Sequence, residues 1–325
     1  MTAAVRPEDP LWPRAGAWPA LHHLDPEASA DLVLLGVPTW RTSLSPTNAH
    51  ATPAAIRDAL RRYSPAVVSG ATQSGQSGQS GPSGPLVDLG ALVVADAGDV
   101  DEPDGPEGEP RTTAAVAGAL ERAGAIMALG GDNSATVPVA LGAWGGRLAT
   151  AGLITIDAHF DLRDGISNGS PVRRLIETGL DPARVVQIGI ADFANSAAYA
   201  HRAAQLGITV VHRDALHGRH LAEVMAGALA VAGSGGGPVH LDIDVDVCDR
   251  SVAPACPASV PGGLAAWELR ALVRAAARDP RVRSADLVEI DATADAPDGR
   301  TVRLAALCVL EFLAGLAERR TGVAG

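Results

Sequence analysis

The feature that most constrains the fold is a regular alternation of short apolar runs with longer stretches of helical spacing. Ala- and Arg-rich stretches predict helices over 52–64, 111–124, 170–179, 218–233 and 265–279. Between them, runs rich in Val, Leu and Ile predict strands over 31–38, 91–100, 125–132, 152–161, 185–193, 207–214, 238–247 and 284–292. This alternation is typical of an α/β fold in which helices cover both faces of a parallel sheet.

Length and charge limit the classes of function. The 325 residues suit one large α/β domain or two smaller ones. Neither the low-complexity loop 69–85 nor the acidic loop 99–110 resembles a domain boundary, so we expect a single domain over 1–325. A net charge of -11 disfavours nucleic acid and anionic membranes as partners and favours a small-molecule substrate.

Targeting signals and cysteines add little. The sequence shows no apolar run of membrane-spanning length, and its start lacks a secretory pattern, so we expect a cytoplasmic protein. Cys248, Cys256 and Cys308 are too few and too unevenly spaced for a disulfide scaffold, and we interpret them as buried apolar residues. A redox-sensitive pair formed by Cys248 and Cys256 remains open.

Acidic side chains gather where the predicted strands end. In "LITIDAHFDLRD", Asp157, His159 and Asp161 occupy every second position after an apolar run. In "HLDIDVDVCD", Asp242, Asp244 and Asp246 repeat the same spacing. Alternate side chains of a strand share one face, so this spacing directs several carboxylates and one imidazole to the carboxyl edge of the sheet, where α/β folds bind ligands.

Crowded carboxylates lose solvation and repel one another unless a cation lies among them. The two clusters hold more ligands than one ion needs, which predicts a two-metal centre, and oxygen ligands with one imidazole favour Mn²⁺. Paired ions could activate a bridging water as a hydroxide nucleophile. Taken singly, "DAHFD" is also compatible with a loop that carries an N-cap Asp, and "DIDVD" with a Ca²⁺ loop or a solvated edge strand.

Four motifs in series extend this interpretation. "GGDNS", "IDAHFDLRD", "DIDVDVCDRSVAP" and "VEIDATADAPDGRTVRLAA", preceded by "GVPTWRTSLSP", resemble the ureohydrolase family of arginase, agmatinase and formimidoylglutamase. The resemblance covers roughly 31–318. It implies a three-layer α/β/α sandwich with a mainly parallel sheet, two Mn²⁺ ions, and hydrolysis of a C–N bond in a guanidine or amidine. Homo-oligomers are common among such relatives.

Position by position, the resemblance implies a role for each acidic residue. Asp157 and Asp244 match carboxylates that bridge the two ions, and Asp161 matches a ligand of the first ion. His159 and Asp246 match ligands of the second. Glu289 matches a carboxylate that pairs with the substrate's amidinium or guanidinium. Asp249 matches a third Asp, which we place behind the ligands.

Two positions depart from the family pattern. Asn133 stands where the family usually has a metal-binding His, and we retain it as a ligand of the first ion, although an amide oxygen is a weaker ligand for Mn²⁺ than imidazole. Asn168 stands where arginases carry a His that shuttles protons. Both features, with "GIADFANSAAYAHRA" over 189–203, resemble the formimidoylglutamase branch.

These residues predict a substrate and a mechanism. N-formimidoyl-L-glutamate carries two carboxylates, for which Arg163, Arg173 and Arg174 are candidate clamps, with Asn168 as a further substrate contact. We expect metal-bridging hydroxide to attack the amidine carbon while Glu289 orients the amidinium, and Asp161 to pass a proton to the departing amine. The products would be L-glutamate and formamide.

Three alternatives remain open at this stage. A guanidine hydrolase such as agmatinase would release urea, and a metal-depleted relative would bind without catalysis. A histone-deacetylase-like hydrolase with one zinc fits the paired acidic motifs poorly.

Overall fold

The computed structural model describes residues 9–68 and 86–321, so the predicted low-complexity loop 69–85 lies outside the described residues. Ten strands are found there: β1 Ala30–Val37, β2 Ala66–Val68, β3 Leu86–Asp88, β4 Val94–Asp99, β5 Ala123–Gly130, β6 Gly152–Ile156, β7 Val185–Ile190, β8 Thr209–His212, β9 Val239–Asp244 and β10 Val282–Val288. Eight helices accompany them: α1 Thr52–Leu60, α2 Gly108–Glu121, α3 Thr136–Trp144, α4 Pro171–Thr178, α5 Ala197–Leu206, α6 Leu221–Ala232, α7 Ala266–Ala277 and α8 Arg300–Thr321.

Eight of the strands form one parallel sheet in the order β4-β1-β5-β10-β9-β6-β7-β8, and β2 pairs with β3 in a small antiparallel ribbon. All eight strands expected from the apolar runs are strands of this sheet. The β2–β3 ribbon was not expected, because its strands are only three residues long. The predicted α/β fold with a parallel sheet is confirmed.

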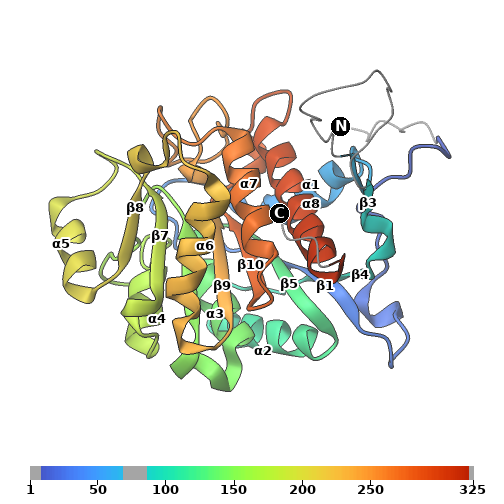
Figure 1. Ribbon diagram of the computed structural model, residues 1–325, viewed down its shortest axis with the longest axis horizontal. Helices are drawn as coiled ribbons and strands as arrows, with labels where there is room; N and C mark the ends of the chain where they lie inside the picture. Colours follow the sequence, from blue (N-terminus) through green and yellow to red (C-terminus); the bar gives the residue numbers. More distant parts are fainter. Residues whose placement is uncertain (1–8, 69–85, 322–325) are drawn as a thin grey trace, which may run out of the picture.

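Helices cover the sheet on both faces, as the near-continuous burial of the central strands requires (Figure 1). On one face α1, α6, α7 and α8 pack in the largest apolar cluster, and on the other α2, α3 and α4 pack in two smaller clusters. The five helices expected from the sequence are present, whereas α3, α5 and α8 were not expected. Among the described residues, no helix combines the length and apolar character that a membrane crossing requires.

Local signals explain where the helices near the site begin. Pro171 lies in the first turn of α4, where its missing N–H costs nothing. Ser196 precedes α5, and its hydroxyl accepts a hydrogen bond from the Tyr199 N–H at 3.2 Å. Each helix therefore starts just after a loop at the carboxyl edge of the sheet, and those loops carry the polar residues.

Candidate metal centre and active site

Sheet register brings the predicted acidic motifs together. Strand β9 lies between β6 and β10, with Ile243 opposite Ile156 and Asp244 opposite Val288. The residues that follow these pairs, Asp157 and Glu289, therefore flank Asp244 along the carboxyl edge. The loop after β5 joins them, because the Glu289 N–H donates to the Gly131 carbonyl oxygen at 2.9 Å. Four loops that are distant in sequence thus form one site.

The strand-alternation argument holds only for part of these motifs. Strand β6 ends at Ile156, so Asp157, His159 and Asp161 lie in the following loop, and Asp161 has a φ of 52°. Strand β9 ends at Asp244, and Asp246 lies in the 3-10 turn Val245–Val247. The predicted strands over 152–161 and 238–247 are therefore too long. Tight turns, and not a strand pleat, direct these side chains into the site.

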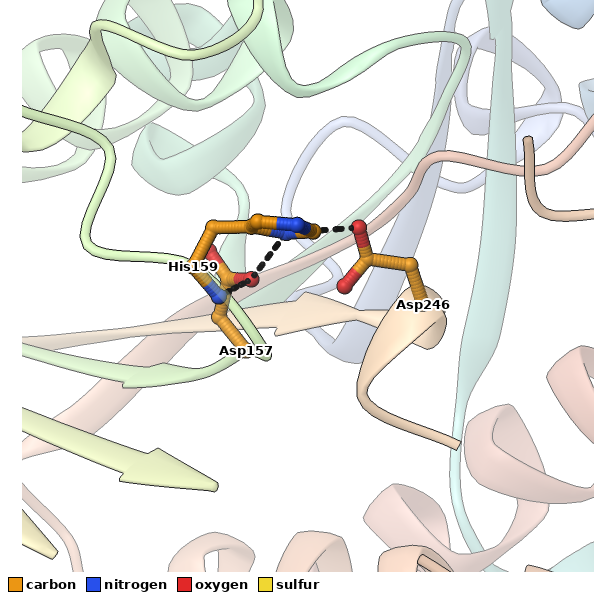
Figure 2. A group of neighbouring side chains, drawn as sticks. All are labelled: Asp157, His159 and Asp246. Atoms are coloured by element: carbon orange, nitrogen blue, oxygen red, sulfur yellow. Dashed lines mark hydrogen bonds and ion pairs between the residues drawn. The ribbon is translucent and has the colours of Figure 1, made fainter. Parts of the chain in front are cut away.

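Asp157, His159 and Asp246 form a compact group of metal-ligand type, with ligand atoms within 4.8 Å of one another (Figure 2). His159 Nδ1 lies 3.0 Å from Asp246 Oδ2 and 3.5 Å from Asp157 Oδ1. The backbone orients two of the three side chains, because the His159 N–H donates to Asp157 Oδ1 at 2.7 Å and the Ala158 N–H to Asp246 Oδ1 at 3.4 Å.

The electrostatics of this group fit a divalent cation. The Asp246 carboxylate raises the pKa of His159 to about 12, and burial, with Asp246 beside it, raises the pKa of Asp157 to about 6. Asp157 Oδ2 is buried and has no hydrogen-bond partner among the described residues. A cation would neutralise these two buried carboxylates, and oxygen and nitrogen donors of this kind suit Mn²⁺.

Asp161, Asp244 and Asn133 adjoin this group. Asn133 Nδ2 donates to Asp161 Oδ2 at 2.6 Å and to Asp244 Oδ2 at 3.3 Å. Asn133 Oδ1 instead accepts a hydrogen bond from Thr136 Oγ1 at 2.6 Å. Burial raises the pKa of Asp161 and of Asp244 well above its usual range, with neighbouring carboxylates as a second cause. The amide of Asn133 thus presents its nitrogen to the acids, and its role as a metal ligand stays a prediction.

Glu289 is the buried acid on the opposite side of Asp244. Its Oε1 accepts hydrogen bonds of 2.8 Å from the Asn133 N–H and from Asn168 Nδ2. Burial, with Asp132 nearby, raises the pKa of Glu289 to about 8. Asn168 Oδ1 accepts from the Leu44 N–H at 3.0 Å, so this predicted substrate contact also orients Glu289. Glu289 has a φ of 65°, a conformation that needs such support.

These side chains line a cavity of about 350 Å³. Its lining includes His159, Asp161, Arg163, Asn168, Asp244, Asp246 and Glu289. No hydrogen bond or ion pair from residues 9–68 or 86–321 reaches the Arg163 guanidinium. The acids and the exposed Arg163 therefore line the same cavity.

The other two predicted clamps are engaged elsewhere. Arg174 binds both carboxylate oxygens of Glu109 on α2, at 2.7 and 2.8 Å. Arg173 pairs with Glu177 and donates to the carbonyl oxygens of Arg163 and Gly165. Neither is among the lining residues, so the structure brings only Arg163 of the three arginines to the cavity.

Several lining residues were not predicted from the sequence. Leu44 and Ser45 come from the loop after β1, Asn195 comes from the segment that leads into α5, and Tyr199 from the first turn of α5. The quoted "GIADFANSAAY" stretch contained Asn195 and Tyr199, but its pattern indicated no chemistry. Asp249, placed behind the ligands, accepts hydrogen bonds from the Ser251 and Gly262 N–H groups and so holds its own loop.

Comparison with known proteins gives this site a family. A model described as the arginase family matches residues 30–315. The chain belongs to the arginase family. The predicted ureohydrolase membership is thereby confirmed, and the metal-ligand group lies on the matched part of the chain.

Individual relatives of this arginase-family chain differ in substrate. It is 37% identical over 192 residues to a formimidoylglutamase of Halalkalibacterium halodurans, covering 58% of this chain and 60% of that one. It is 34% identical over 201 residues to a guanidinopropionase of Pseudomonas aeruginosa, covering 59% and 61%. These matches thus span about three fifths of the curated relatives' length. The crystal structure of a Bacillus subtilis formimidoylglutamase is 28% identical, with a TM-score of 0.83 over 98% of this chain and 96% of that one.

Proposed function

We propose that the chain is a manganese-dependent hydrolase of a linear amidine, N-formimidoyl-L-glutamate, and that it releases L-glutamate and formamide. The observation that carries the proposal is the division of charge within one cavity. The acids that line it, Asp161, Asp244, Asp246 and Glu289, are buried, whereas Arg163 in the same lining is exposed. This division matches a substrate that carries a cationic amidinium and two carboxylates, one on the carbon next to the amidine nitrogen and one at the far end of the side chain.

The buried acids of the site would hold the metal and the amidinium. Asp157, His159 and Asp246, with Asp161 and Asp244 beside them, would hold two divalent ions, which supply an activated water when bound. Glu289 would accept hydrogen bonds from the amidinium, since two asparagine donors already fix its other oxygen. The amidine carbon is then oriented toward the metal-binding carboxylates.

The protons and bonds balance within this cavity. The attacking water forms a new C–O bond, and the C–N bond to the glutamate nitrogen breaks. Asp161, which lines the cavity, would accept the proton that the water loses and return it to the departing amine. Formamide leaves with the former amidine carbon, and no other reactant is needed.

A carboxylate of the substrate would meet Arg163. Its guanidinium has five N–H donors in a planar fork, which suits bidentate binding of a carboxylate. Ser45 and Ser196 line the same cavity and offer hydroxyl groups to a second carboxylate. An agmatine-like substrate has a cationic tail and would be repelled by Arg163.

A product-resolved assay tests this proposal. The protein, loaded with Mn²⁺, is offered formimidoylglutamate, guanidinopropionate, guanidinobutyrate and agmatine, and formamide and urea are quantified separately. We expect formamide from the first substrate and little urea from the others. The matched control is Asp244→Asn, which retains the side-chain volume, weakens metal binding and should abolish product formation.

The second candidate function is hydrolysis of a guanidino acid. The similarity to a guanidinopropionase favours it, and that substrate also carries a carboxylate for Arg163. Urea from guanidino acids without formamide from formimidoylglutamate would establish this candidate. Absence of both products, with less than half a manganese ion bound per chain, would instead support a binding protein without catalysis.

A further inference from the structure

Asn195 is a loop residue to which the proposed reaction assigns no role. It lies between the end of β7 at Ile190 and the start of α5 at Ala197, in the stretch "IADFANS". Its side chain is half-buried and lines the cavity beside the metal-ligand loop. Its hydrogen bonds connect this stretch with the loop that carries His159.

The amide group of Asn195 binds the backbone on both sides of His159. Its Oδ1 accepts a hydrogen bond from the Phe160 N–H at 3.0 Å, and its Nδ2 donates to the Ala158 carbonyl oxygen at 2.8 Å. Gln187, which is fully buried on β7, donates to the Phe160 carbonyl oxygen at 3.0 Å. Side chains therefore pair with this loop as a neighbouring strand would.

Regular strand pairing is ending in this loop: the Ala158 carbonyl oxygen still accepts from the Ala191 N–H at 3.0 Å, whereas the Phe160 N–H and carbonyl oxygen are bound by the side chains of Asn195 and Gln187. Register pairing of β6 with β7 ends at Ile156, two residues before Ala158. The next ligand, Asp161, is held at a φ of 52°, which non-glycine residues seldom adopt. Such a conformation persists only where surrounding contacts over-determine it. The Asn195 contacts lie between the last strand residue and this strained ligand.

The same amide also stabilises the loop that carries Asn195 itself. Asn195 Nδ2 donates to the Ala191 carbonyl oxygen at 3.1 Å, which closes a short turn around Phe193. Phe193 has a φ of 62°, and its side chain is fully exposed at the cavity. One side chain thus ties two strained segments together across the site.

We infer that Asn195 is a positioning residue, which sets the orientation of the His159 imidazole and the Asp161 carboxylate toward a bound divalent cation. It acts through the backbone of Ala158 and Phe160, which flank His159. The inference rests on the proposed metal centre. It does not depend on which amidine or guanidine is hydrolysed.

The test measures Mn²⁺ affinity and local backbone protection in three variants. Asn195→Ala removes all three hydrogen bonds, and Asn195→Asp keeps only the acceptor for the Phe160 N–H. The control is Asp181→Ala, which removes a hydrogen bond from the Ala183 N–H and an ion pair with Arg184 at the opposite end of β7. Free Mn²⁺ is quantified by electron paramagnetic resonance, the Phe160 amide by hydrogen exchange, and stability by thermal unfolding.

We expect Asn195→Ala to weaken Mn²⁺ binding by about 10- to 100-fold, the range for groups that orient metal ligands. The Phe160 amide should exchange faster in that variant and keep most of its protection in Asn195→Asp. Asp181→Ala should lower stability without changing Mn²⁺ affinity. If Asn195→Ala does not fold, Asn195→Asp alone should still weaken Mn²⁺ binding by at least about threefold, as a fraction of that loss.

Two outcomes would overturn the inference. One is an Mn²⁺ affinity in the Asn195 variants within twofold of wild type. The other is an equal loss of affinity in Asp181→Ala, since that would indicate general destabilisation. Failure of the proposed substrate looks different, because the wild type would then bind Mn²⁺ without releasing formamide while Asn195→Ala still weakened the binding.

Discussion

At the scale of single residues, the orientation of the Asn133 amide bears on whether this residue can bind a metal ion. Thr136 Oγ1 donates to its oxygen, so its nitrogen faces Asp161 and Asp244. An N–H group pointed at these carboxylates satisfies them partly without a cation. A neutral imidazole would instead offer a lone pair to the ion.

We therefore expect Asn133→His to increase the manganese retained per chain. The replacement removes the amide donor that competes with a cation for Asp161 and adds a stronger ligand. Wild type and variant are loaded with Mn²⁺, dialysed together and analysed for bound metal. The variant should retain about one ion more than wild type, and equal metal content in both would contradict the argument.

Arg163 is the second residue whose environment supports a prediction. Arg163→Met should raise the KM for formimidoylglutamate about 10- to 100-fold, because a hydrogen-bonded charge pair contributes about 1.5 to 3 kcal/mol. The kcat should change less, since the interaction of Arg163 with a substrate carboxylate does not involve the reacting carbon. Steady-state kinetics measure both constants.

Arg174→Met serves as the matched control for Arg163. Its guanidinium is already bound to Glu109, so the variant should lose stability while its KM stays within twofold of wild type. A larger KM effect from Arg174 than from Arg163 would place the carboxylate clamp on α4.

At the scale of elements, the ends of the strands explain the arrangement of the site. Each of β5, β6, β9 and β10 is followed directly by a polar turn, although β9 and β10 also carry buried polar residues, among them His240 and Asp286. The turn after β5 approaches the loop after β1 so closely that a Cβ atom at Gly131 would overlap the Thr39 carbonyl oxygen. Glycine is therefore required in "GGDN", and this close approach delivers the Asn133 N–H to Glu289.

Helices α7 and α8 illustrate a second interaction between elements. Glu318 on α8 pairs with Arg274 and Arg278, each at 2.5 Å, and only 10% of its side chain is exposed. Burial acts to raise the pKa of Glu318, but the hydrogen bonds from Arg278 and Arg274 outweigh it and lower the pKa. A carboxylate with a lowered folded-state pKa stabilises the fold above its unfolded pKa.

Glu318→Gln should thus destabilise the protein by about 1 to 3 kcal/mol at pH 7, because it removes the carboxylate charge from mostly buried hydrogen bonds with Arg274 and Arg278. The difference from wild type should shrink as the pH falls below about 4.3, the unfolded pKa of Glu. Urea unfolding at pH 7 and pH 3 measures it. Asp298→Asn breaks an exposed pair with Arg300 and should change stability little at either pH. An undiminished effect of Glu318→Gln at pH 3 would exclude the charge as its cause.

At the scale of the whole molecule, the site concentrates negative charge in the interior of an already acidic protein. Burial raises the pKa of Asp157 to about 6 and that of Glu289 to about 8, and Asp246 raises that of His159 to about 12. All three groups bind protons more tightly in the folded state than in the unfolded chain. Their contribution to stability is therefore complete below the unfolded pKa and is lost as the pH rises through the folded pKa.

Chelator-treated protein should consequently lose thermal stability as the pH rises from 5 to 8.5, by at least about 4 °C in Tm. Added Mn²⁺ should restore it, and the gain should grow with pH because the ligands must lose protons to bind metal. Differential scanning fluorimetry across this range measures both. Asp157→Asn is the control and should remove most of the gain, whereas a gain of equal size at pH 5 and 8.5 would argue against metal binding at these acids.

The sequence alone determined the fold class, and it indicated the acidic residues that the structure brings together at the carboxyl edge of the sheet. Apolar runs of strand length must be buried on both faces, and that requirement specified all eight strands of the parallel sheet. Acidic residues directly after such runs had to meet at one edge, because the strands are parallel. Helices α3, α5 and α8 were missed, and their length is not the reason, since α1 and α4 are as short as α3 and α5.

Only the tertiary structure decided how each side chain is used. It separated Arg163 from Arg173 and Arg174, because ion pairs with Glu177 and Glu109 depend on neighbours that no spacing rule reveals. It also turned the Asn133 amide toward the acids and brought Asn195 to the backbone beside His159. These contacts join residues from different loops, and their geometry follows from strand order and strained turns that local sequence does not encode.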